Sequence, residues 1–333
     1  MPDSAFDVIP YVSIVLAGRN DNYDGDFLKR FFTALQFNHR ELEVRAIAHE
    51  FVLVEWAPIP GVPYLIDLLE ERCSASLVET VRAVIVDPAY QQAMTLSPRI
   101  VFHQYLAKNV GVRRSRGEYL ISTNCDVILG RRILQRLEER ALEPEVLYRA
   151  PRWDLAPTVE VERIDWACLE ATANLARPGK QLRPPYFRGS TGDFILLDRD
   201  TFQRLGGFNE IYRLSRSGVD ANLVTHAVSS GIRVVDIGGP VYHLHHDRTT
   251  QVLKARPAGS DALELYGNKS WRYRDVVYRN RQTWGSAQAP ERTIGPRRTY
   301  LDFSWDAVPP LVDLAGIVVP STRASGNPLK QRR

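Results

Sequence analysis

Short, almost uninterrupted apolar runs that end in polar residues constrain the fold of this chain more than any other feature. Before residue 130 these runs cover residues 11–16, 51–54, 81–86 and 119–121. Parallel strands that are covered on both faces have such near-continuous apolar sequences, because neither face contacts water. Between the first two runs, residues 27–35 carry apolar side chains at helical spacing. The alternation predicts an α/β fold with a doubly wound, mainly parallel sheet flanked by helices.

Polar residues follow these runs, and they are Asn20 and Asp21, Glu55, Asp87, Asn124 and Asp126. Ligands of doubly wound sheets bind beyond the carboxyl ends of the strands, so we expect a binding site at this edge. Alternate residues of a strand point the same way, so oxygens of Asn124 and Asp126 can meet one cation, which can hold a diphosphate. The alternative is a plain turn after a buried strand, because Asn and Asp are common in turns.

Charge and cysteine usage narrow the class of protein. The net charge of +4 suits an anionic small ligand or a membrane surface and does not indicate nucleic acid as a partner. The cysteines Cys73, Cys125 and Cys168 are scattered and lack metal-site spacing, so we expect a cytoplasmic location, with the inner face of the membrane left open. The N-terminus resembles no signal peptide, and no apolar run is long enough to span a bilayer.

Two short motifs before the fourth apolar run carry a family resemblance. Residues 107–112 read Ala-Lys-Asn-Val-Gly-Val, and residues 116–119 read Arg-Gly-Glu-Tyr. Their order and spacing resemble the core of GT-A nucleotide-sugar glycosyltransferases, especially the large inverting family 2, which typically shows Ala-Arg-Asn-x-Gly-Ile, Ala-x-Gly-Glu-Tyr and then Asp-x-Asp. Residues 12–20 are similar to that family's first strand. Residues 189–210 look like an acceptor-side region shared with the polypeptide N-acetylgalactosaminyltransferases.

The resemblance, which covers roughly residues 11–248, implies a domain organisation and an activity. It implies a GT-A catalytic domain over residues 1–250, with a nucleotide-sugar-binding half (11–130) and an acceptor-binding half (131–250). Residues 251–333 are expected to form an irregular C-terminal extension. The implied enzyme is a hexosyltransferase that moves a sugar from a nucleoside diphosphate sugar to a hydroxyl of a polysaccharide, glycan or lipid-linked acceptor. Inversion and a divalent metal, Mn²⁺ or Mg²⁺, are also implied.

The family pattern assigns donor-binding residues. The tip of the first strand and nearby positions would hold the nucleotide, and these residues are Ala17, Gly18, Arg19, Asn20, Glu55, Asn109, Arg113 and Asn124. Two positions depart from the pattern. Asn124 replaces the first acid of Asp-x-Asp, and Glu55 with Trp56 stands where the family usually has two Asp residues. Trp56 either stacks on a ligand or packs in the interior.

Histidines gather just after the apolar run at residues 232–237, at His243, His245 and His246. In an extended chain His243 and His245 face the same side, and neutral imidazole is a good ligand for Mn²⁺. Related GT-A enzymes place a histidine ligand here, and His243 matches that position best. We therefore expect Asp126, His243 and His245 as metal ligands, with a solvated histidine cluster as the alternative.

Two carboxylates are candidates for the catalytic base. The resemblance assigns this role to Asp220, at the start of a predicted helix over residues 219–228, where the family carries Glu-Asp. A carboxylate is suited to remove the proton of an attacking hydroxyl as the sugar develops oxocarbenium character. Asp193 is the second candidate, or it orients the acceptor. The alternative for Asp220 is that it only stabilises the helix dipole.

The C-terminal part leaves several alternatives open. Residues 271–284 interleave aromatic side chains with arginines, as a lid, a membrane contact or the surface of a homo-oligomer would. Two further classes of protein share the expected architecture. One is a sugar nucleotidyltransferase, which would carry a Gly-rich, Arg-containing loop after the first strand, and residues 17–20 match it poorly. The other is a catalytically silent nucleotide-binding scaffold, which the Asn at position 124 leaves open.

Overall fold

The computed structural model describes residues 9–23, 25–95, 100–175, 192–210, 213, 218–246 and 279–308. Its main element is a large sheet. In spatial order its strands are β10 (Arg233–Asp236), β6 (Val146–Arg149), β9 (Phe194–Asp198), β4 (Tyr119–Thr123), β1 (Val12–Gly18), β2 (His49–Trp56), β3 (Val81–Val86), β13 (Arg298–Leu301) and β12 (Glu291–Ile294). All of them run in one direction except β9 and β12. The expected mainly parallel sheet is therefore confirmed.

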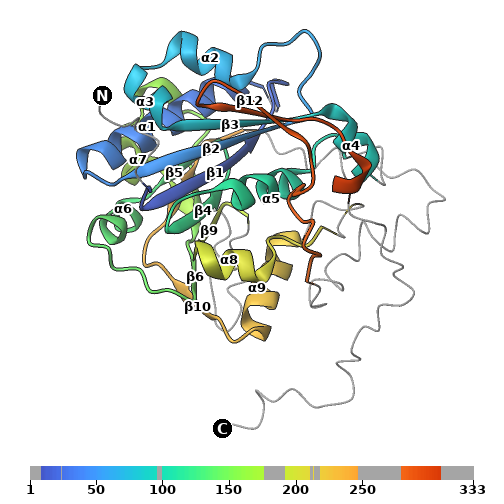
Figure 1. Ribbon diagram of the computed structural model, residues 1–333. Helices are drawn as coiled ribbons and strands as arrows, with labels where there is room; N and C mark the ends of the chain where they lie inside the picture. Colours follow the sequence, from blue (N-terminus) through green and yellow to red (C-terminus); the bar gives the residue numbers. More distant parts are fainter. Residues whose placement is uncertain are drawn as a thin grey trace, which may run out of the picture.

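Helices cover both faces of the large sheet (Figure 1). One layer contains α1 (Phe27–Val44), α2 (Leu65–Arg72), α3 (Ala75–Thr80) and α6 (Arg131–Glu138), and the other contains α4 (Pro88–Met94), α5 (Gln104–Arg114), α8 (Arg199–Leu205) and α9 (Val219–Ser229). Side chains alternate along β1, so Ile14 and Leu16 enter the first layer while Val15 and Ala17 enter the second. Burial on both faces explains why the strands are apolar at almost every position.

A smaller sheet lies beside the large one. It orders β5 (Val127–Leu129), β11 (Val241–His243), β7 (Arg152–Asp154) and β8 (Asn174–Leu175), and α7 (Trp166–Thr172) and the short turn η1 (Val161–Arg163) accompany it. Ile128 and Tyr242 of this sheet share a third apolar cluster with Phe37 of α1. Neither this sheet nor β6 was predicted from the sequence. Strands of two to four residues are too short to show a periodicity.

Two glycines of the family-like motifs lie where a side chain has no room. A Cβ added to Gly111 of α5 would lie 2.5 Å from Cγ1 of Val15, and one added to Gly117 would lie 2.5 Å from the backbone nitrogen of Ser13. Helix α5 therefore packs directly on β1, and the segment that enters β4 runs against the start of β1. These close approaches fix α5 against the middle of β1 and the start of β4 against the start of β1.

Two predicted helix boundaries differ from the observed ones. Ser97 with Pro98 after it predicts the start of the helix before β4, but this position lies outside the described residues and α5 begins at Gln104. From the sequence, Asp200 is expected to cap the helix after the apolar run at residues 194–197, and this expectation is wrong, because the side chain of Asp198 caps α8. Gly206 ends α8 at a φ of 78°, as the sequence predicts.

The described part of the C-terminal extension is more regular than expected. Strand β13 pairs with β3 and β12 pairs with β13, while Trp284 is buried in the second layer and the short turn η3 (Trp305–Ala307) follows. Most of the segment assigned as a lid, membrane contact or subunit surface lies outside the described residues. Within the described ranges, no helix combines the length and the apolar character that crossing a bilayer requires.

A buried carboxylate joins three strands at the amino edge of the large sheet. Glu50 of β2 is 2% exposed, and its Oε1 accepts hydrogen bonds from Ser13 Oγ (2.6 Å) and the backbone N–H of Arg116 (2.8 Å). Its Oε2 pairs with the guanidinium groups of Arg82 (3.2 Å) and Arg116 (3.0 Å). Burial alone raises the pKa of Glu50, but these donors and charges together hold it below the usual value of 4.5.

The lowered pKa of Glu50 predicts a pH-dependent contribution to stability. Its contribution is fully present above the unfolded-state pKa and is lost as the pH falls through the lower folded-state pKa. We expect Glu50→Gln to lower the free energy of unfolding by about 2–3 kcal/mol at pH 7, and by much less at the acid end of the folded range. Urea unfolding across pH measures this, with the exposed Glu71→Gln as control. A difference that stays constant with pH contradicts the assignment.

Candidate active site

The pairing of the smaller sheet brings two distant parts of the chain together. Strand β11 runs antiparallel to β5, and His243 lies opposite Val127. The backbone N–H of Leu244 also donates to the carbonyl oxygen of Asp126 (2.9 Å). The imidazole of His243 therefore stands beside the carboxylate of Asp126, at the carboxyl end of β4.

Three side chains converge at this point with donor atoms that suit a metal ion. His243 Nε2, His246 Nε2 and Asp126 Oδ2 form a triangle with sides of 3.2, 3.3 and 3.5 Å. Metal bonds of about 2.1 Å separate neighbouring ligands by about 3.0 Å in octahedral and about 3.4 Å in tetrahedral geometry. Two imidazoles and one carboxylate fit a divalent transition metal. His245, the predicted ligand, is exposed and lies outside this group, and His246 takes its place.

Neighbouring polar groups hold His243 in position. Strand β7 runs parallel to β11 with Asp154 opposite His243, and Asp154 Oδ1 lies 3.3 Å from His243 Nδ1. Arg152 holds Asp154 through a bond of 2.6 Å, and its Nη2 lies 2.9 Å from the same ring nitrogen. Asp154 can accept a hydrogen bond from Nδ1–H, an arrangement that is common around metal-binding histidines, whereas the guanidinium of Arg152 can only donate to this nitrogen.

Charges in the cluster reinforce one another. Burial alone lowers the pKa of His243, but Asp126 and Asp154 raise it to about 9. Burial alone raises the pKa of Asp126, but His243 and His246 hold it well below its usual range. The carboxylate is therefore ionised at neutral pH, as a metal ligand must be.

A cavity of about 210 Å³ opens over this cluster. Six predicted site residues line it, namely Ala17, Gly18, Arg19, Asn124, Asp126 and His243. Arg152, His246 and Phe102 add positive charge, a metal donor and an aromatic face. The predicted ligand edge of the sheet, beyond β1 and β4, is thus where the cavity lies.

Asn124 is held by protein groups on all sides. Its Oδ1 accepts from Lys108 Nζ (2.8 Å) and Gln104 Nε2 (2.6 Å), and its Nδ2 donates to Asp193 Oδ1 (2.8 Å). An aspartate here would set a second negative charge against Asp193, which explains why an amide replaces the first acid of the family pattern. Asn124 lines the cavity but has no oxygen left for a metal.

Glu55 and Asn20 lie next to the cavity without lining it. Glu55 is 2% exposed, its Oε2 accepts from the backbone N–H of Leu65 at the start of α2 (2.8 Å), and burial raises its pKa to about 7. Asn20 donates to the carbonyl oxygen of Pro63 (3.0 Å). The ring of Trp56 is fully buried and donates to Gln91, so Trp56 packs in the interior. These contacts position the tip of β1.

Asn109 and Arg113 have structural contacts away from the cavity. Asn109 Nδ2 donates to the carbonyl oxygen of Phe208 (2.7 Å) and to Glu210 Oε1 (2.9 Å), and its Oδ1 accepts from the N–H of Phe208 (2.7 Å). Arg113 lies over the ring of Trp284, 5.0 Å from its centroid. Asn109 therefore holds α5 against the segment that follows α8, Arg113 holds it against Trp284, and neither residue lines the cavity.

The two candidate bases lie in a buried charged group behind Asn124. Asp193 is 6% exposed and lies 3.3 Å from the guanidinium of Arg152, and Asp220 is 4% exposed in the first turn of α9. Burial lowers the pKa of Lys108 to about 8, against the opposing charges of Asp193 and Asp220. Asp220 also lies near the buried Arg149 and opposes the lowering of its pKa by burial. Neither carboxylate lines the cavity formed by the described residues.

Four contributors to this region were not predicted, namely Lys108, Arg152, Asp154 and His246. The three-residue spacing of His243 and His246 was visible, but the sequence did not show that the chain curves after β11. Arg152 and Asp154 reach the site only through the pairing of β7 with β11. Strands of three residues gave no signal for that pairing.

Comparisons with known proteins give remote likenesses. No family model matches the chain, and no curated protein matches it. Among solved structures, S. aureus TarS (residues 1–349) is similar at 10% identity and a TM-score of 0.42, over 70% of this chain and 60% of TarS. The catalytic domain of Drosophila β1,4-galactosyltransferase 7 with xylobiose is similar at 14% identity and a TM-score of 0.41, over 89% of this chain and 96% of that one.

A variant of the same Drosophila enzyme, in complex with manganese, UDP-Gal and xylobiose, gives 14% identity and a TM-score of 0.42 over 90% and 97% of the two chains. By its name this enzyme is a glycosyltransferase. The likeness to the polypeptide N-acetylgalactosaminyltransferases stays a prediction. Identities and TM-scores this low establish no function for this chain.

Measurements of metal affinity can distinguish His246 from its neighbour His245, because only His246 belongs to the cluster. We expect His246→Ala to weaken Mn²⁺ binding at least about tenfold, because it removes one of three converging donors. His245→Ala is the matched control and should leave the affinity unchanged, because that side chain is exposed. Titration calorimetry with Mn²⁺ measures both. Equal losses in the two variants contradict the placement of His246.

Proposed function

We propose that the chain is a GT-A glycosyltransferase that transfers a sugar from a nucleoside diphosphate donor to a hydroxyl acceptor. One observation carries the proposal: the Asp126–His243–His246 cluster opens into a cavity at the carboxyl ends of β1 and β4. Such a cluster suits a cation that binds a diphosphate, and this edge is where doubly wound sheets bind nucleotides. The resemblance of residues 107–126 to family 2 supports the same reaction.

In this proposal the cavity holds the donor. The backbone of Ala17 and Gly18 approaches the nucleotide, and Phe102 and Arg19 offer an aromatic face and a positive charge. Arg19 is 5.9 Å from the ring centroid of Phe102 and donates to Asp21 (2.7 Å), so it is held in place before a ligand binds. Glu55 and Asn20 support this tip from behind instead of touching the base.

A divalent metal, with Mn²⁺ as our candidate, would bind Asp126, His243 and His246. When bound, it supplies positive charge to the leaving diphosphate. Arg152 and Asp154 keep the imidazole of His243 turned toward the cluster. Lys108 and Asn124 form a rigid polar wall beside the cluster, and Lys108 is fully buried.

We assign the base role to Asp220 and a positioning role to Asp193. Asp193 accepts from Asn124 (2.8 Å) and from Arg152 (3.3 Å), so these two side chains hold its carboxylate in place. Asp220 lies beside Gly192, and a Cβ on that glycine would be 3.9 Å from Asp220 Oδ2. Removal of the acceptor proton by Asp220 fits an inverting displacement, which we propose together with a glycan or lipid-linked acceptor.

Activity with a donor panel tests the proposed function. The purified chain is incubated with UDP, GDP and dTDP sugars and Mn²⁺, and release of free nucleotide is measured. We expect release with at least one donor, its loss on chelation, and its loss in Asp126→Ala. The exposed Asp200→Ala, whose side chain is 88% exposed, is the matched control. Failure to bind any nucleotide sugar excludes a glycosyltransferase, and formation of a nucleotide sugar from a nucleoside triphosphate identifies a nucleotidyltransferase.

The base assignment has its own kinetic signature. We expect Asp220→Asn to lower kcat by about 10²–10⁴-fold while KM for the donor stays within about twofold, because the donor contacts remain. Asp193→Asn should instead raise KM, since it releases Asn124 and Arg152. Steady-state kinetics with the best donor separate these effects. A variant Asp220→Asn with unchanged kcat contradicts the assignment.

A further inference from the structure

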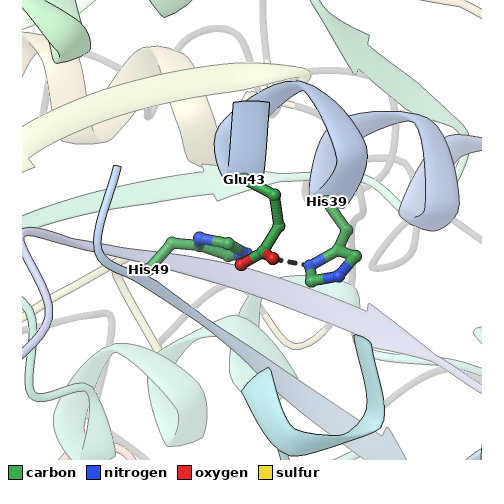
Figure 2. Close-up of side chains that lie close together, drawn as sticks. All are labelled: His39, Glu43 and His49. Carbon is green, nitrogen blue, oxygen red and sulfur yellow. Dashed lines mark hydrogen bonds between the residues drawn. The ribbon is translucent and has the colours of Figure 1, made fainter. Parts of the chain in front are cut away.

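A second group of side chains that can bind a metal lies at the amino ends of the strands of the large sheet. His39 and Glu43 lie one turn apart on α1, and His49 is the first residue of β2. Figure 2 shows the two α1 side chains pointing toward His49. One donor atom from each lies within 4.8 Å of the others. The proposed active site lies beyond the carboxyl end of the strands, whereas this group lies at the amino end of β2.

The distance between the two imidazoles fits a metal ion that is bound to both. His39 Nδ1 lies 3.1 Å from His49 Nε2. Bonds of about 2.05 Å in a tetrahedral zinc site would separate these nitrogens by about 3.3 Å, so little movement is needed. Glu43 is exposed near the end of α1, and its long side chain can swing in as the third ligand. Water can complete the site.

The other nitrogen of each ring already has the partner that a metal-bound histidine requires. His49 Nδ1 lies 2.8 Å from the carbonyl oxygen of Ile47, which accepts a proton only and so leaves the lone pair of Nε2 facing the cluster. His39 Nε2 lies 3.1 Å from Ser76 Oγ in α3. Metal-binding histidines almost always donate their second N–H in this way. Both rings are thus oriented for a cation between them.

We propose that His39, Glu43 and His49 bind a zinc-class divalent cation, at a site separate from the candidate active site. Two nitrogens and one carboxylate oxygen match Zn²⁺ and disfavour Ca²⁺ or Mg²⁺, which prefer oxygen ligands. The end of α1 adds the negative pole of the helix dipole. The cation cross-links α1 to β2 and, through Ser76, to α3. The site does not depend on the proposed transferase activity.

Zinc binding in a background without the other cluster tests the proposal. The His246→Ala variant is stripped with chelator, desalted and titrated with Zn²⁺ against a chromophoric competitor. We expect it to bind one equivalent, and we expect His39→Gln in the same background to bind none or at least about tenfold more weakly. Absence of zinc binding in His246→Ala, or unchanged binding after His39→Gln, overturns the proposal and indicates a simple hydrogen bond between the two rings.

Milder variants guard against a loss that comes from misfolding. Glu43→Gln changes an exposed side chain, and Ser76→Ala removes only the partner of His39. In the His246→Ala background, each should weaken Zn²⁺ binding several-fold to about tenfold with unchanged far-UV circular dichroism. Co²⁺ should give the visible absorption of a four-coordinate site in His246→Ala and lose it in the double variant His246→Ala/His49→Gln. A Co²⁺ spectrum that is the same in both variants refutes the assignment, and transferase activity should not change in Glu43→Gln.

Discussion

The pairing of β11 with β5 is the interaction on which the candidate site depends. It places His243 opposite Val127 and therefore beside Asp126, although more than a hundred residues separate them in the chain. The parallel pairing of β7 with β11 then adds Asp154 and Arg152 from a third segment. None of these groups forms a site by itself. A short sheet of backbone hydrogen bonds assembles donors, acceptors and charge at the end of β4.

Behind the cluster, charge balance explains the unusual residues of the chain. Lys108 and Arg149 are buried with relative exposures of 0% and 1%, a position that such side chains occupy only with partners. Asp193 and Asp220 supply the opposing charge, and Asn124 connects Lys108 to Asp193. A neutral amide is needed at position 124 because an acid already stands beside it. The departure from Asp-x-Asp is therefore a feature of this network and does not argue for an inactive protein.

Much of the fold was predictable, and the site only in part. Strands covered on both faces leave apolar runs, so β1 to β4 and the carboxyl-edge cavity followed from the sequence. The motif resemblance did not distinguish residues that bind a ligand from residues that stabilise the fold. Asn109 matches a family motif, yet its hydrogen bonds connect α5 to Phe208. His245 was preferred to His246 because an extended chain was assumed beyond β11. Short strands and chain direction after them depend on tertiary contacts, which no local pattern contains.

The hairpin of β13 and β12 has a consequence for how the chain behaves in solution. It pairs with β3, whose sequence is Val-Arg-Ala-Val-Ile-Val. Without the hairpin, one side of β3 would present a row of unpaired backbone groups to strands of other molecules. The outermost strand, β12, is fully exposed and carries Glu291 and Arg292, which discourage further pairing. In a fragment that stops before residue 290, the outermost strand of the sheet is the apolar β3 instead of the charged β12. Such a truncation therefore causes self-association, although it removes no catalytic group.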